Sequence, residues 1–155
     1  MNLIADGFWL LCLGLVYYNF RVGMRRLAAT AGPQLEEGQR YMRIFAVAAT
    51  VPWVVMGWGV VFGSVPRGMF AYFRPQDLNP YVLAWLGSVF ALFVLLALWV
   101  LLADGARKIQ QFGLLSPFGA RGGGQTMSLG SIKFLAYASP LFLPVWCLLA
   151  ASMDA

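Results

Sequence analysis

Four apolar stretches, separated by three polar ones, form the main pattern along this chain. The longest runs from Leu78 to Ala103 and holds 26 residues without a charge. A helix of about 20 apolar residues crosses the hydrocarbon core of a bilayer, so this stretch predicts a membrane-spanning helix from Tyr81 onward. The other three stretches have the same character. The pattern therefore predicts an all-α protein, an integral membrane bundle of four transmembrane helices.

The limits of the spans follow from the positions of charged and helix-breaking residues. We expect transmembrane helices over about residues 3–20, 44–63, 81–103 and 132–153, and polar loops over 21–43 and 104–131. An outer loop, 64–80, joins the second span to the third, and all of these segments form one domain over 1–155. Beyond the third span, Asp104 is expected to prolong the helix into water together with Arg107 and Lys108, as an ion-paired turn.

Prolines interrupt two of the expected spans. Pro52 lies in the second, and Pro140 and Pro144 lie one helical turn apart in the fourth. Because proline has no backbone N–H, each leaves a carbonyl group without its usual donor and is expected to bend or locally unwind the helix. The carbonyls freed at Pro140 and Pro144 could bind a cation or form a gate, although a static bend is the simpler interpretation.

The composition excludes a soluble protein of this size. The chain has 155 residues, of which 61% are hydrophobic and 11% charged, and its mean hydropathy is +0.73. Soluble domains average about 25% charged residues, and so short a chain could not bury this much apolar surface. The formal net charge of +5 does not indicate nucleic-acid binding, because the basic residues lie between apolar runs, where topology signals belong.

The basic residues also give the expected orientation. Nine of the eleven lie in or beside the segments 21–43 and 104–131, and the other two lie in 64–80. Since positively charged loops stay in the cytoplasm, both termini and the 64–80 loop are expected on the outer, periplasmic side. The compact loops and the predominance of arginine favour a bacterial inner membrane.

The chain offers little for catalysis or for binding a cofactor. It has no histidine, the commonest general base, and no ionisable residue at the middle of any span. Cys12 and Cys147 lie inside apolar runs, are interpreted as packed hydrophobes, and would face each other only if the first and last spans are neighbours. Gly119 to Thr126 has the outline of a phosphate-binding loop, but Gln125 stands in place of the lysine, so a flexible linker is favoured. We therefore expect no catalytic residue, no metal and no cofactor.

Three sets of residues are expected to make contacts outside their own helix. Small residues at i, i+3, i+4 and i+7 form one face of the third span and permit close helix packing: Ala84, Gly87, Ser88 and Ala91. Cations of the first cytoplasmic loop either set the topology alone or also attract anionic lipid headgroups: Arg21, Arg25, Arg26, Arg40 and Arg43. The outer loop mixes aromatic rings with charges that suit a partner protein or a lipid: Arg67, Phe70, Tyr72, Phe73, Arg74 and Asp77.

These features favour a structural or accessory membrane protein over an enzyme. The expected partners are membrane lipids and either other membrane subunits or a second copy of the chain, with no nucleic acid. A small oligomeric transporter or channel, gated at Pro140 and Pro144, or a lipid-binding protein is the alternative. An enzyme that acts on lipids through Glu36, Glu37 or Asp104 ranks last, because neither histidine nor a metal cluster supports it.

Overall fold

The protein is a bundle of helices. The computed structural model describes the backbone of residues 3–30, 32–63, 65, 68–74, 79–114 and 127–153, and no strand occurs in these ranges. The α-helices are α1 (Leu3–Thr30), α2 (Leu35–Phe62), α3 (Pro80–Leu102), α4 (Gly105–Phe112) and α5 (Leu129–Met153). Two short 3₁₀ helices, η1 (Gly32–Gln34) and η2 (Gly68–Phe73), lie on either side of α2. The all-helical prediction is confirmed for these residues.

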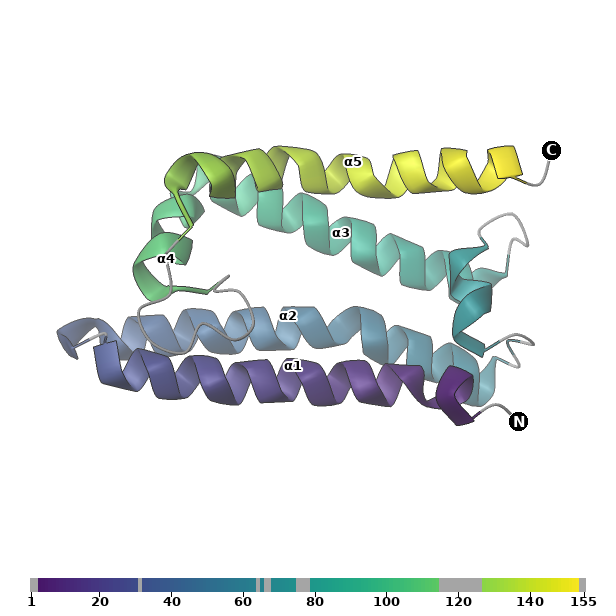
Figure 1. Ribbon diagram of the computed structural model, residues 1–155, viewed down its shortest axis with the longest axis horizontal. Coiled ribbons are helices and arrows are strands. Elements are labelled where there is room, and N and C mark those ends of the chain that lie inside the picture. The colour runs from purple at the N-terminus through teal and green to yellow at the C-terminus, as the bar shows by residue number, and fades with distance from the viewer. Residues whose placement is uncertain are drawn as a thin grey trace.

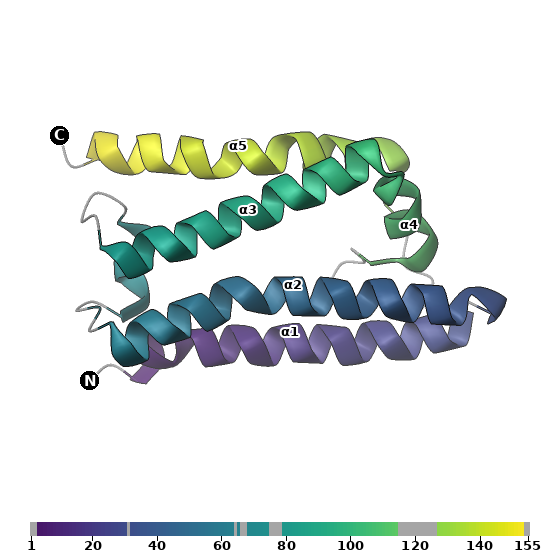
Figure 2. The ribbon, with the colours of Figure 1, turned by 180° about the vertical axis from the view of Figure 1, so that it is seen from behind.

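Four long helices lie side by side and define two ends of the bundle. Helices α1 and α2 pack as an antiparallel hairpin, and α3 runs obliquely from α2 at one end to α5 at the other (Figures 1 and 2). The η2 helix, the start of α1 and the end of α5 share one end, called here the η2 end (Figure 1). Helix α4 covers the opposite, α4 end (Figure 2).

Three stretches are long and apolar enough to cross a membrane. They are Gly32–Phe62, Pro80–Leu102 and Leu129–Leu148, all within the described residues. Helix α1 is as long as α2, at 28 residues each, and lies beside it (Figure 1). The integral membrane class is therefore supported by three helices, while the fourth span remains a prediction for α1.

The start of α3 is capped by Asn79 and led by Pro80. The side chain of Asn79 accepts a hydrogen bond from the backbone N–H of Tyr81 at 2.9 Å, and Pro80 occupies the first turn. An N-terminal cap of this kind satisfies one of the donors that a helix leaves unpaired at its start. The 64–80 connection thus ends in a fixed geometry.

The end of α3 differs from the prediction. We expected Asp104 to prolong the helix, but α3 stops at Leu102 and Asp104 adopts a left-handed backbone with φ of 57°. A Cβ atom on Gly105 would lie 2.6 Å from the ring of Trp99, so only glycine lets the chain fold back against that ring. A separate helix, α4, begins there. The expected pair of Arg107 with Asp104 does form, at 3.5 Å.

Two groups of buried apolar side chains hold the bundle together, one at each end. At the η2 end the cluster includes Met56, Tyr72 and Trp85; at the α4 end it includes Ile109 and Ile132. Burial of apolar area drives folding in water, but helices in lipid associate mainly through close packing. The bundle is therefore stabilised where side chains interlock at its two ends.

Glycines of α2 are the positions at which large side chains from other elements come close. A Cβ atom at Gly57 would lie 2.6 Å from the ring of Trp9, and one at Gly38 would lie 2.8 Å from both Leu27 and Phe112. At Gly59 it would overlap the hydroxyl group of Tyr72. Glycine at these positions lets α2 receive α1, α4 and η2 at short distance.

The prolines do not interrupt their helices. Helix α5 continues through Pro140 and Pro144, and α2 continues through Pro52, so the local unwinding expected there is not found. A missing N–H at Pro140 deprives the carbonyl group of Ala136 of its usual donor. The hydroxyl group of Ser139 donates to that carbonyl at 3.4 Å and compensates for the loss.

The two cysteines are far apart. Cys12 is buried on α1 and Cys147 is half-buried on α5, and both are free thiols. Figure 1 shows α1 and α5 on opposite sides of the bundle, so the first and last spans are not neighbours. The condition under which these cysteines could face each other is therefore not met.

Candidate functional site

The small-residue face of α3 points out of the bundle. Ala84, Gly87 and Ala91 are exposed and Ser88 is half-buried. A Cβ atom built on Gly87 would meet nothing within 4 Å. The hydroxyl group of Ser88 donates to the carbonyl oxygen of Trp85 at 2.7 Å and needs no further partner. No described helix of the same chain occupies this face.

The exposed face of α3 is longer than the four residues singled out in the sequence. Leu95, Leu98 and Leu102 continue it with exposed fractions of 65%, 48% and 79%. With the small residues they alternate in steps of four and three: Ala84, Ser88, Ala91, Leu95, Leu98 and Leu102. This is the spacing of a left-handed helix pair. The sequence analysis names only the four small residues, and the four-three spacing is the signal that joins the leucines to them.

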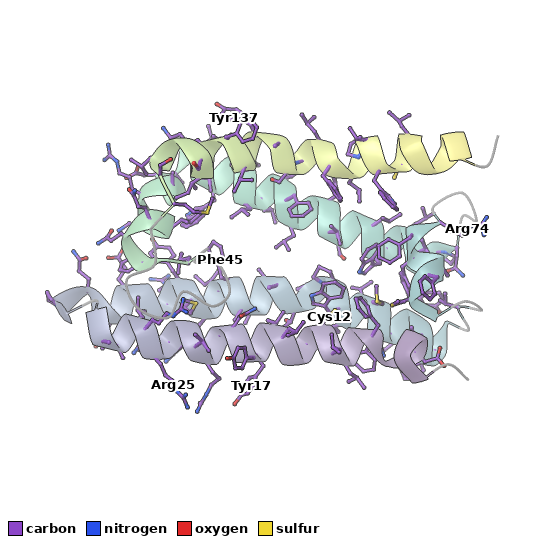
Figure 3. All side chains as sticks on the ribbon, in the orientation of Figure 1. Cys12, Tyr17, Arg25, Phe45, Arg74 and Tyr137 are labelled. Carbon is purple, nitrogen blue, oxygen red and sulfur yellow. The ribbon has the colours of Figure 1, made fainter. Side chains whose placement is uncertain are left out.

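The expected lipid-contacting arginines gather near the α4 end of the hairpin. Residues of α1 and α2 meet there in an antiparallel register, since Gly23 lies against Met42 and Leu27 against Gly38. Of the cations at this level, Arg26 is half-buried and makes an interaction, and the others are exposed: Arg21, Arg25, Arg40 and Arg43. Figure 3 shows Arg25 pointing away from the bundle.

In the described part of the 64–80 loop, some side chains are exposed and others are buried. Phe70 and Phe73 are exposed by 57% and 40%, and Arg74 is half-buried with an interaction of its own. Tyr72, expected to be a contact residue, is instead fully buried. Arg67 and Asp77 lie outside the described residues. The surface available to a partner in this region is therefore formed by Phe70, Phe73 and the neighbouring Trp146, whose ring centroid lies 6.1 Å from that of Phe73.

Tyr72 joins η2 to α2. Its hydroxyl group donates to the carbonyl oxygen of Met56 at 2.9 Å, in the space that Gly59 leaves open. Burial, with a smaller contribution from the nearby phenol of Tyr81, raises the pKa of Tyr72 from 10.0 to about 12. The sequence groups Tyr72 with Phe70 and Phe73, which are exposed, but Tyr72 instead holds η2 against α2.

Helix α4 is attached to the start of α2 by contacts that the sequence did not reveal. The ammonium group of Lys108 lies 2.5 Å from a carboxylate oxygen of Glu37, and Gln111 donates to the side chain of Gln34. The hydrogen bond that Lys108 donates to Glu37 is the main cause that raises the pKa of Lys108. The ammonium group also lies 5.9 Å from the ring centroid of Tyr41. Lys108 and Glu37 are 71 positions apart in sequence, and Gln111 and Gln34 are 77 apart, so no local pattern indicates their contact.

Aromatic rings fill the space beneath α4. Trp99 of α3 lies between Tyr41 and Phe45 of α2, with ring centroids 5.6 and 5.5 Å away. Phe112 of α4 stacks on Tyr41 at 5.9 Å. Figure 3 shows Phe45 pointing from α2 toward this region. The two helical pairs, α1–α2 and α3–α5, are therefore joined at this end through α4.

A groove opens between α3 and α5 beside α4. Its volume is about 410 Å³. Helix α3 lines it with Phe93, Leu96 and Val100, α4 with Ile109, and α5 with residues between 132 and 142. The hydroxyl group of Ser139, on its wall, already donates to the Ala136 carbonyl group. The lining is thus apolar in character.

The described residues contain no grouping typical of an active site. None of them forms a set of three metal-ligating side chains, and no polar or charged residue among them is buried. The glycine-rich segment from Gly119 to Thr126 lies outside the described residues. Pro140 and Pro144 are not among the residues that line the groove between α3 and α5.

No protein-family model, curated protein or solved structure matches this chain. Its function is therefore argued from the surfaces described above.

Proposed function

We propose that this protein is a non-catalytic membrane protein that associates with another transmembrane helix through the outward face of α3. The partner helix belongs to a second copy or to another subunit of a membrane complex. The observation that carries the proposal is Gly87, which is exposed at the middle of a long apolar helix and meets nothing in its own chain.

Close packing is the physical basis of this association. Lipid tails are as apolar as leucine, so helices in a bilayer gain little from hydrophobicity and associate where small residues let their backbones approach. The glycines of α2 near large side chains already serve such contacts within the chain. Gly87 has the same chemistry and no contact, and its helix continues in the four-three spacing that suits a paired helix.

In this proposal all four long helices cross a bacterial inner membrane, with the α4 end in the cytoplasm. The distribution of charge supports that orientation. Most basic side chains of the described residues lie toward the α4 end: those of α1, α2 and α4, and Lys133 near the start of α5. Figure 3 shows Arg25 toward that end and Arg74 at the η2 end. Cytoplasmic loops carry the excess of Lys and Arg. Both termini then lie on the outer side.

The test is the mass of the particle that contains the full chain after extraction from its membrane in a mild, lipid-preserving medium. We expect a mass above that of one chain, and we expect Gly87→Leu to reduce the associated fraction by about tenfold, since a leucine side chain separates the two backbones. The composition of the particle tells a second copy from a different subunit.

Gly14→Leu provides a matched control. Gly14 is also exposed within an apolar helix and meets nothing within 4 Å, so the same substitution changes the same amount of lipid-facing surface on α1. An unchanged mass for Gly87→Leu, or an equal loss of association for both variants, would refute the assigned face.

A further inference from the structure

We propose that the groove between α3, α4 and α5 binds one acyl chain of an anionic phospholipid from the cytoplasmic leaflet. This inference goes beyond the proposed association. The groove uses Phe93, Leu96 and Val100 of α3, whereas the association face uses the exposed residues of the same helix from Ala84 to Leu102. Both surfaces can therefore be occupied at once.

The length of the groove fits one leaflet. On α5 it extends from Ile132 to Phe142, a distance of about 15 Å at about 1.5 Å per residue. The hydrocarbon core of a bilayer is about 30 Å thick, so the groove covers about half of it. It begins beside Ile109 of α4, at the end of the bundle, and ends near the middle of α5. An acyl chain whose headgroup lies at the α4 end would follow this path.

The width of the groove favours a single chain over a helix. A volume of about 410 Å³ over about 15 Å gives a mean cross-section of about 27 Å². A helix with side chains is about 10 Å across, which corresponds to a cross-section of about 80 Å². The width of the groove is therefore closer to that of an extended hydrocarbon chain than to that of a whole transmembrane helix.

The charge near the mouth of the groove complements an anionic headgroup. Lys133 follows the lining residue Ile132 directly and is exposed. Ser128 and Ser131, at the start of α5, share a hydrogen bond of 2.9 Å and add hydroxyl groups at this level. Basic side chains at a membrane surface attract anionic lipids over neutral ones.

The experiment counts the phospholipid that remains on the full chain. The protein is reconstituted in vesicles of equal phosphatidylglycerol and phosphatidylcholine, extracted in mild detergent, washed, and weighed intact with its bound lipid. We expect one phosphatidylglycerol per chain. Leu135→Trp fills the groove and should reduce this retention by about tenfold, the effect of losing one well-placed contact surface. The milder Ala138→Leu should reduce it less.

Two controls separate the groove from general effects. Leu141→Trp introduces the same ring on the same helix at a residue that is 64% exposed and does not line the groove, so retention should be unchanged. Lys133→Gln should reduce the preference for phosphatidylglycerol by about fivefold, the effect of about 1 kcal/mol per basic residue. Lys133→Arg keeps the charge and should leave the preference unchanged.

Three results would overturn the proposal. They are retained lipid with the composition of the vesicle, equal retention by Leu135→Trp and Leu141→Trp, and a lipid-free dimer that covers the groove with a second copy.

Discussion

At the scale of single residues, a glycine of α2 and a tyrosine of η2 explain how these two elements pack closely together. The space at Gly59 is filled by the phenol of Tyr72, which donates to the Met56 carbonyl group. Glycines within an apolar span leave room for close contact, but the sequence alone does not say which side chains of other elements fill that room. That information depends on contacts between elements distant in the chain.

Replacing Gly59 by alanine should destabilise the protein. The added Cβ atom overlaps the Tyr72 hydroxyl group and lies 2.9 Å from the Cβ atom of Tyr81, so packed groups must shift. Overpacking of this kind costs about 1–3 kcal/mol, more than the gain of up to about 1 kcal/mol from the better helix propensity of alanine. Unfolding in a fixed detergent mixture measures the difference. Gly14→Ala, in open space, should be neutral or stabilising.

The phenol of Tyr72 should make stability depend on pH in the alkaline range. Because burial raises its pKa from 10.0 to about 12, the folded state keeps a proton that the unfolded state loses. The contribution is complete below pH 10 and disappears as pH rises toward 12, a change of about 2 kcal/mol.

The comparison with Tyr72→Phe isolates this group from other titrating residues. The variant should be about 1 kcal/mol less stable at neutral pH, because it lacks the hydrogen bond to Met56. The difference between the two proteins should narrow above pH 10 and reverse before pH 12, because the expected loss of about 2 kcal/mol exceeds it; unfolding midpoints compared across pH measure this change. A constant gap up to pH 12 would contradict the assigned pKa.

At the scale of elements, α4 is the helix that the sequence did not predict as a separate element. Each expected span overlaps one long helix, but α1 and α2 continue through most of the segment 21–43, which the sequence predicts to be a polar loop. The sequence predicts the residues of α4 as an extension of α3, because Asp104 and Arg107 have helical spacing. The turn at Asp104 follows from the contact between Gly105 and Trp99, which involves the packing of α3 against α2. A pattern within one segment does not contain that information.

Removal of the Glu37 carboxylate should loosen α4 without unfolding the bundle. The hydrogen bond from Lys108 to Glu37 crosses 71 positions in sequence and fixes α4 on α2. Glu37→Gln should increase amide hydrogen exchange in residues 105–112 severalfold, while exchange in α3 stays unchanged.

The matched control for this contact is Glu36→Gln, which changes the same charge one residue away and should leave exchange in α4 as it is. The ion pair should persist at alkaline pH, because the raised pKa of Lys108 keeps its charge above the usual range. It is fully present below pH 10.5, the ordinary pKa of lysine, and is lost as pH rises through the higher folded value. Equal exchange in both variants would exclude this attachment.

At the scale of the whole molecule, the two ends differ in charge and in architecture. The α4 end combines the cations of α1, α2 and α4, and the η2 end has an aromatic surface around Phe70 and Phe73. The sequence predicted the charge asymmetry because it is a property of loops along the chain. It could not predict the groove, which depends on how α3, α4 and α5 are rotated against one another, whereas the four-three spacing of the outward face of α3 can be read along the chain.

The central claim is that four helices cross the membrane with the α4 end in the cytoplasm. The most direct test is labelling of single cysteines by a membrane-impermeant thiol reagent on intact cells, in a chain with Cys12→Ala and Cys147→Ala. We predict that Asp6→Cys and Phe70→Cys react from outside, and that Ala28→Cys reacts only after the cells are made permeable. These positions lie at the two ends of α1 and on η2. Reaction of Asp6→Cys and Ala28→Cys from the same side would show that α1 does not cross, and reversed labelling would contradict the orientation.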